Sequence, residues 1–130
     1  MRNKVYGRRL SRSRSARKAL FRSQVRALVL NGKISTTKAK AKALQPEIDK
    51  IMNLVSKGDH LAKRAVLSRL GNDRETMDDL FGKYKDLAKS RKSGFSRISK
   101  HPLRKGDRAE TVSLEFVQTK NEKDKSTKDK

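Results

Sequence analysis

A chain of 130 residues is long enough for one ordinary domain with a small hydrophobic core. Its formal net charge of +21 exceeds what solubility needs and opposes compaction unless a polyanion neutralises it. The absence of cysteine excludes disulfides, thiol nucleophiles and cysteine-ligated metal sites, and no apolar run is long enough for a membrane span or a secretory signal. We therefore expect a soluble, intracellular protein with an extended, negatively charged partner.

The positive charge is concentrated at the start of the chain. Residues 1–46 contain fourteen lysines and arginines and no carboxylate, because the first acidic residue is Glu47. Residues 1–14 have few apolar side chains, so we expect a basic arm that is extended and disordered in the free protein.

From Ser15 the pattern becomes helical, up to the Asn31-Gly32 pair that is typical of helix ends. Ser13 or Ser15 is the expected N-cap. The apolar stripe of this helix consists of Phe21, Val25, Leu28 and Val29. A basic ladder lies about a quarter-turn away and consists of Lys18, Arg22 and Arg26. One face is expected to enter the core while its flank offers cations.

A short strand and a long helix are expected next. Residues 33–37, KISTT, are β-branched and follow a glycine, which indicates a strand. Thr36 or Thr37 then starts a helix that ends at Lys57-Gly58, and Pro46 predicts a kink or a fresh first turn within it.

Two further helices are expected after aspartate caps. Asp59 precedes HLAKRAVLSRL, and Asp73 precedes RETMDDLFGKYKDLA, in which apolar residues recur at helical spacing. This pair is also compatible with a helix-turn-helix reader, but four carboxylates on its second helix would be repelled by phosphate.

The last elements are two strands. FSRISKH and ETVSLEFVQ are expected to be strands joined by the loop PLRKGDR, and in the second one Val112, Leu114 and Phe116 alternate with Ser113, Glu115 and Val117. Residues 119–130 have no apolar side chain to bury and are expected to form a disordered lysine-rich tail.

The fold class expected from this order is α+β. It is a two-layer α/β sandwich of order α-β-α(3)-β(2), because the strands bury their apolar faces only if helices cover them. We divide the chain into the arm (residues 1–14), one globular domain (15–118) and the tail (119–130).

The residues offer little material for catalysis. His60 and His101 are far apart and belong to no motif, and Glu75, Asp78 and Asp79 lie in the first turns of a helix, where acidic residues are favoured for structural reasons. No phosphate-binding, dinucleotide-binding, zinc-protease or serine-hydrolase motif is present. We expect no enzyme activity, no cofactor and no metal site.

Nucleic-acid binding has better support, because arginine pairs bidentately with phosphate and each contact releases condensed counterions. Hydroxyls and amides at Thr36 and Thr37 are candidates to hold a phosphate beside Lys38, although simple capping explains these residues equally well. Two other interpretations of the basic stretch of residues 8–22 are a transit peptide and a serine-arginine tract controlled by phosphorylation. Neither fits well, because the stretch runs without a break into a helix of the core and its repeat is short.

Four stretches of this sequence resemble one known family. They are MRNKVYGRRLSRSRSARKALFR (residues 1–22), ISTTKAK (34–40), DHLAKRAVLSRL (59–70) and RKGDRAETVSLEFV (104–117). Together they resemble the bacterial large-subunit ribosomal protein L17 (bL17) family, over nearly the whole chain to about Val117. The family typically has histidine where Asn3 and Ala16 stand, so contacts of those side chains do not carry over.

The resemblance implies the same fold order and a structural role in the large ribosomal subunit, in the cytoplasm. It also implies binding to large-subunit ribosomal RNA near the exit side of the peptide tunnel, beside neighbouring proteins that include protein thirty-two of that subunit. The RNA-binding residues that it implies are Arg2, Lys4, Arg8, Arg9, Arg12, Arg14, Arg17, Lys18, Arg22, Arg26, Thr36, Thr37 and Lys38. The alternative is a free DNA-compacting or regulatory protein, because charge alone does not separate RNA from DNA.

Overall fold

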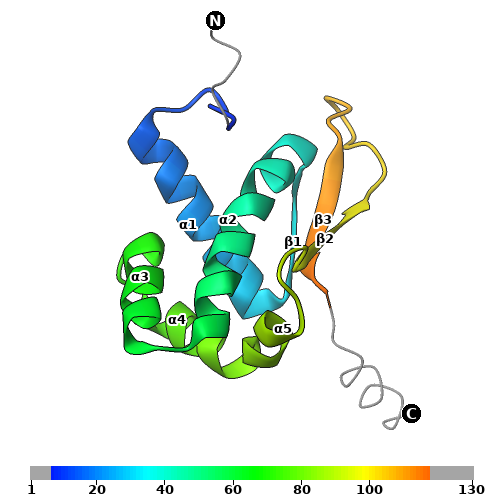
Figure 1. Ribbon diagram of the computed structural model, residues 1–130. Coiled ribbons are helices and arrows are strands. Elements are labelled where there is room, and N and C mark those ends of the chain that lie inside the picture. The colour runs from blue at the N-terminus through cyan, green and yellow to red at the C-terminus, as the bar shows by residue number, and fades with distance from the viewer. Residues whose placement is uncertain (1–6, 118–130) are drawn as a thin grey trace, which may run out of the picture.

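The computed structural model describes residues 7–117 of the chain (Figure 1). The expectations for Arg2, Lys4 and the tail therefore lie outside the described residues. In chain order the elements are α1 (Arg14–Asn31), β1 (Lys33–Thr37), α2 (Lys38–Lys57), α3 (His60–Leu70), α4 (Arg74–Lys83), α5 (Lys85–Ser90), β2 (Ser96–Lys100) and β3 (Thr111–Phe116).

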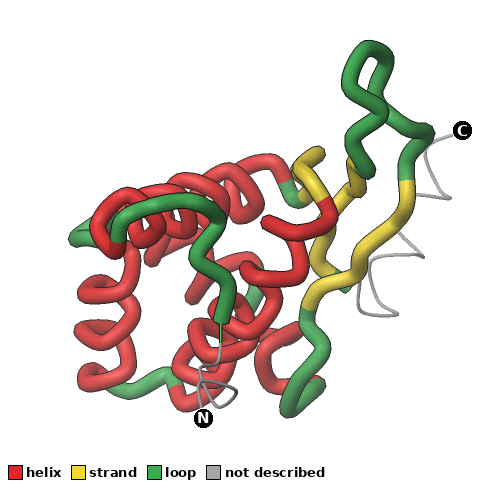
Figure 2. Tube along the Cα trace, turned by 90° about the horizontal axis from the view of Figure 1, so that it is seen from above, coloured by secondary structure: helices red, strands yellow, loops and turns green. Residues whose placement is uncertain are grey.

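The three strands form one antiparallel sheet in the order β1-β3-β2. Ile34, Leu114 and Ile98 are in register across it and face the helices. The contacts of α1 and α2 with the strands, and the view in Figure 2, place the helices on one side of the sheet. The predicted two-layer α+β fold is therefore confirmed.

The helix α2 is the centre of the core. Its buried side chains include Leu44, Ile48 and Met52, and it contacts α1, α3, α5 and all three strands. Pro46 lies inside this helix, which runs unbroken from Lys38 to Lys57, so no new helix begins at the proline, in contrast to one of the two predictions for this position. The carbonyl of Lys42 lacks its usual helical donor there, because proline has no amide hydrogen.

The predicted ends of the helices agree with the capping contacts. Side-chain oxygens of Ser13, Asp59 and Asp73 accept hydrogen bonds from backbone amides in the first turns of α1, α3 and α4. Glycines in the left-handed conformation end α1, α2 and α3, with φ between 70° and 76°. These local signals are visible in the sequence because each cap acts within a few residues of itself.

One predicted helix is divided in two. The segment expected to run from Arg74 to Ala88 is interrupted at Tyr84, whose φ of −106° and ψ of 8° depart from helical values. At this break the Tyr84 hydroxyl donates to the Val29 carbonyl at 3.1 Å, and its ring packs on Phe116 with 4.3 Å between centroids. Long-range packing thus overrides a continuous local pattern.

Burial in the central strand is not confined to its apolar face. Val112, Leu114 and Phe116 are buried, and Ser113, on the opposite face of the strand, is also only 1% exposed. It lies between Ser35 on β1 and Ser99 on β2, because β3 is the middle strand and has neighbours on both sides.

Candidate nucleic-acid interface

Three basic segments lie at one end of the molecule, the upper end in Figure 1. They are residues 7–14, the first turns of α2 (residues 38–42) and the chain from residue 100 to residue 110 between β2 and β3. We call this the basic end. Its cations are Arg8, Arg9, Arg12, Arg14, Lys38, Lys40, Lys42, Lys100, Arg104, Lys105 and Arg108. Only two carboxylates, Asp107 and Glu110, accompany these eleven cations, so the basic end has a large excess of positive charge.

Residues 7–13 turn back toward the start of α1. The Arg12 amide donates to the Arg9 carbonyl at 3.1 Å, and Leu10 and Ser11 both have φ of 52°. The guanidinium of Arg17 donates to the carbonyls of Arg9 and Arg12, at 3.5 and 3.3 Å. These contacts fix the backbone of the turn through a cation of α1.

The outer arginines of this segment are exposed and free. Within residues 7–117, the side chains of Arg8, Arg9 and Arg14 have no hydrogen-bond or ion-pair partner. Arg12 donates only to the nearby carbonyl of Leu10, at 2.9 Å. These guanidinium groups keep their bidentate donor edges available for phosphate.

The basic ladder of α1 does not act as one unit. Lys18 is exposed and unpaired among the described residues, whereas Arg22 donates from Nε to the Arg69 carbonyl at 3.1 Å and from Nη2 to the Ser68 carbonyl at 3.4 Å. Those carbonyls belong to the last turn of α3, where a cation also complements the helix dipole. Arg22 therefore joins α1 to α3.

Gly71 makes room for this contact. A Cβ atom at Gly71 would lie 2.9 Å from Cζ and Nη1 of Arg22, and the residue has φ of +76°, which side chains rarely adopt. The end of α3 thus depends on glycine for both its conformation and its close approach to Arg22.

Arg26 also binds side chains of the protein itself. It lies 3.4 Å from Asp73 and 3.4 Å from Glu75, at the start of α4. Hydrogen bonds from the hydroxyl and amide of Thr76, together with the charge of Arg26, hold the pKa of Asp73 below its ordinary value despite partial burial. Two of the cations expected at RNA, Arg22 and Arg26, are therefore engaged by partners that lie nearly fifty residues further along the chain.

The structure does not bring Thr36, Thr37 and Lys38 together as one phosphate cradle. Thr36 Oγ1 accepts from Gln24 Nε2 at 3.0 Å on the helical side of the sheet, and Thr37, the residue before α2, makes no side-chain capping bond. The Lys38 amide donates to the Glu110 carbonyl at 3.1 Å, and its Nζ lies 2.7 Å from the Glu110 carboxylate. Lys38 is the member of the trio that belongs to the basic end.

Glu110 is the carboxylate around which lysines gather. Its pKa is lowered by the hydrogen bond and charge of Lys38, and further by the charges of Lys100 and Lys42. These lysines come from α2 and from the end of β2, so the ion pair ties two segments of the basic end to each other.

The connection between β2 and β3 is the part that sequence reasoning missed. It projects from the body of the protein (Figure 2), and its residues 101–108 are all exposed. Arg104 forms an ion pair with Asp107, which also accepts from the Ala109 amide, and these bonds lower the pKa of Asp107 to about 2. Lys105 and Arg108 have no side-chain partner among the described residues. The available signal is the run RKGDR, which by itself predicts only a loop.

The acidic residues lie elsewhere. Glu75, Asp78 and Asp79 are on α4, at the lower end in Figure 1, where Asp79 pairs with Lys83 at 3.0 Å. The charge of the protein is therefore uneven: the basic end is strongly positive, whereas the carboxylates of α4 are interspersed with Arg74 and Lys83. An uneven distribution of this kind favours contact with a polyanion through the basic end.

Within residues 7–117 no cluster of three or more histidine, cysteine or acidic side chains is placed to hold a metal ion. His60 and His101 are both exposed. No helix in that range is long and apolar enough to cross a membrane.

Comparison with known proteins gives one consistent family. The family model described as Ribosomal protein L17 matches residues 20–117. The large ribosomal subunit protein bL17 of Hydrogenobaculum sp. is 40% identical over 119 residues, which cover 91% of this chain and 100% of that protein. The bL17 proteins of Hyphomonas neptunium and Magnetococcus marinus are each 38% identical, over 90% and 91% of this chain and 83% and 94% of their own lengths. The chain belongs to the ribosomal protein L17 family.

Proposed function

We propose that this chain, as an L17-family structural constituent of the large ribosomal subunit, binds large-subunit ribosomal RNA through its basic end. The observation that supports this most directly is the gathering of eleven cations against two carboxylates from three separate segments, with the acidic helix α4 at the other end. Each lysine or arginine that neutralises a phosphate releases counterions, and this release supplies much of the affinity. The protein acts by position, since it offsets phosphate repulsion so that RNA segments pack closely.

The three segments have different parts in this proposal. Residues 7–14 offer unpartnered guanidinium groups to the phosphates of one strand. Lys38, Lys100 and Lys42 surround Glu110 and give the centre of the surface a fixed positive charge. The projecting loop carries Lys105 and Arg108 away from the body, which extends the contact to a second RNA segment.

The site within the subunit is part of the same proposal. The resemblance supports a position near the exit side of the peptide tunnel, beside protein thirty-two, in cytoplasmic ribosomes. With the basic end on RNA, the acidic helix α4 is left for solvent or for a neighbouring protein. Cross-linking of assembled subunits tests this: links from Lys83 or Lys85 to protein thirty-two are expected, and links only to proteins far from the tunnel exit contradict the position.

Sedimentation of cell lysate tests the function itself. The chain is expected in the large-subunit fraction at low salt and to dissociate from it as the salt concentration rises. Footprinting on the ribosomal RNA then locates the contact. Absence from the large-subunit fraction at low salt contradicts the proposal, and recovery on chromosomal DNA instead would favour the DNA-compacting alternative.

A further inference from the structure

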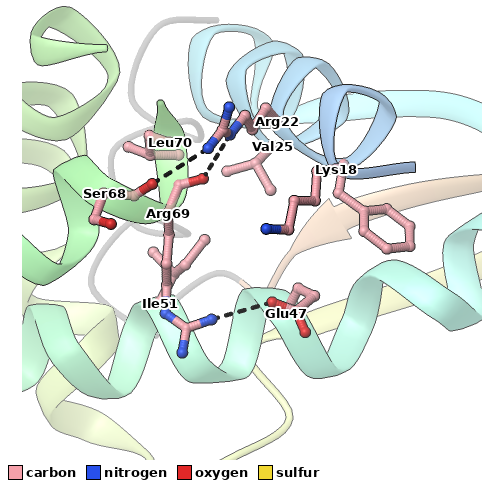
Figure 3. A pocket seen from close by; sticks show the side chains of 9 residues that line it. Lys18, Arg22, Val25, Glu47, Ile51, Ser68, Arg69 and Leu70 are labelled. Atoms are coloured by element: carbon pink, nitrogen blue, oxygen red, sulfur yellow. Dashed lines mark hydrogen bonds and ion pairs between the residues drawn. The ribbon is translucent and has the colours of Figure 1, made fainter. Parts of the chain in front are cut away.

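A pocket of about 270 Å³ lies between α1, α2 and α3, beside the basic ladder of α1 (Figure 3). Its apolar wall consists of Phe21, Val25, Ile51 and Leu70. The volume lies just below the roughly 300–1,000 Å³ of most small-molecule sites, so the pocket suits one ring system and nothing much larger.

The polar side of the pocket carries three cations, Lys18, Arg22 and Arg69, against one carboxylate, Glu47. Arg22 is bound to the end of α3, and Arg69 Nη1 is paired with Glu47 at 3.3 Å. The Lys18 amine points into the pocket and has no partner among the described residues (Figure 3). A ligand with a ring next to a negatively charged group would pack its ring on the apolar wall and pair its charge with Lys18.

We propose that this pocket receives one unstacked nucleotide of the bound ribosomal RNA, with its base on the apolar wall and its phosphate on Lys18. The inference rests on the proposed function. Bases turned out of single-stranded RNA are commonly held by aromatic side chains and arginine planes, and Phe21, Arg22 and Arg69 provide these groups here.

The location of the pocket supports the same occupant. Lys18 lies one helical turn after Arg14, the last free arginine of the basic end, so both side chains share a face of α1. A strand that follows residues 7–14 therefore arrives at Lys18. A carboxylate from a protein partner would pair with Lys18 but leave the apolar wall facing water.

Nuclear magnetic resonance on the isotope-labelled full chain tests the pocket without RNA. Adenosine 5′-monophosphate is expected to shift the methyl signals of Val25, Ile51 and Leu70 in a saturable way, whereas ribose 5-phosphate leaves them in place. Lys18→Ala is expected to weaken the nucleotide about two- to fivefold at low salt, since the pair is exposed. Lys57→Ala, an equal loss of charge at the far end of α2, leaves the affinity unchanged.

A blocking variant gives the second measurement. The Lys18 side chain is exposed and points into the pocket (Figure 3), so Lys18→Trp is expected to fill the pocket, to abolish the methyl shifts and to lower affinity for ribosomal RNA severalfold more than Lys18→Ala does. Ser93→Trp, in an exposed loop, is the matched control.

The possible outcomes separate this inference from the proposed function. If Lys18→Trp binds ribosomal RNA as Lys18→Ala does, or the nucleotide shifts no methyl signal, the pocket inference is overturned while the function stands. Shifts produced by N-acetylglutamate amide but not by the nucleotide also overturn it, in favour of a protein partner. Failure of the parent chain to enter the large-subunit fraction overturns the proposed function. The nucleotide titration is independent of that result, because it measures binding to the pocket in the absence of RNA.

Discussion

The arginines of residues 7–14 and the arginines in the middle of α1 are the same residue type with different roles. Arg8, Arg9 and Arg14 have no partner among the described residues, whereas Arg22 and Arg26 bind carbonyls and carboxylates of α3 and α4. The difference is set by what lies opposite each side chain after folding. A basic stretch that is continuous in sequence therefore contains both unpartnered arginines, to which we assign the proposed RNA binding, and arginines that join helices of the protein.

The largest expected effect concerns the free arginines. Replacement of Arg8, Arg9 and Arg14 together by alanine is expected to weaken binding to ribosomal RNA about 10- to 100-fold at low salt. The slope of log affinity against log salt should fall by roughly 2, because about three phosphate contacts are lost. Filter binding at several salt concentrations measures both quantities.

The control for this variant removes the same charge from the other end. Lys57 ends α2, and Lys85 and Lys89 are on α5, which lies at the lower end in Figure 1. All three are exposed, and their replacement by alanine is expected to change the slope little. Equal losses in both triple variants would mean that net charge, not the basic end, determines binding.

The next effect concerns the close approach at the end of α3. Gly71→Ala is expected to lower the free energy of unfolding by about 1–3 kcal/mol, because the new Cβ meets the Arg22 guanidinium and the backbone has positive φ. Urea unfolding followed by circular dichroism measures this change. Gly82→Ala is the matched control: nothing lies within 4 Å of its Cβ position inside α4, so its stability should stay equal or rise.

Removal of Arg22 is expected to affect stability more than RNA binding. Arg22→Ala is expected to lower the free energy of unfolding by about 1 kcal/mol through the loss of two bonds to carbonyl groups. The salt slope for RNA should fall by less than in the triple variant. If Arg22→Ala reduces the slope as much as removal of a free arginine does and leaves stability intact, the assignment of Arg22 to stability is wrong.

The smallest effect is a pH dependence at Asp73. Its pKa is lower in the folded protein than in the unfolded chain, so the stability from the ionised carboxylate is present above the unfolded pKa and is lost as pH falls through the folded pKa. Asp73→Asn preserves an N-cap but removes the charge. The difference in urea stability between the parent chain and the Asp73→Asn variant should therefore shrink as the pH is lowered from 7 toward 3. A difference that stays constant over this range would contradict the role of the charge.

Features of local origin could be read from the sequence, and features that depend on distant partners could not. Ser13, Asp59 and Asp73 act on amides three residues away, so their caps were predictable. The break at Tyr84 could not be predicted in this way. It coincides with contacts of Tyr84 with Val29 and Phe116, which are distant in sequence and leave no trace in the helical periodicity.

The candidate site shows the same limit. Concentration of charge in residues 1–46 was evident, but the partners of Arg22 and Arg26 and the approach of Lys100 to Glu110 arise only from the fold. The projecting loop was missed because its cations lie far along the chain from the basic block, although they belong to the same end of the molecule. The sequence thus predicts a negatively charged partner, and the fold determines which lysines and arginines are unpartnered and accessible to it.

The sheet order has a consequence for the timing of synthesis. Ser35 of β1 pairs with Ser113 of β3, and β3 is inserted between β1 and β2 although it is the last strand made. Because β1 and β3 are far apart in the sequence, their pairing is expected to be a late step in folding. Residues 7–14 and α1 leave the translating ribosome long before that step, so we expect Arg8, Arg9 and Arg14 to be accessible while β1 is still unpaired.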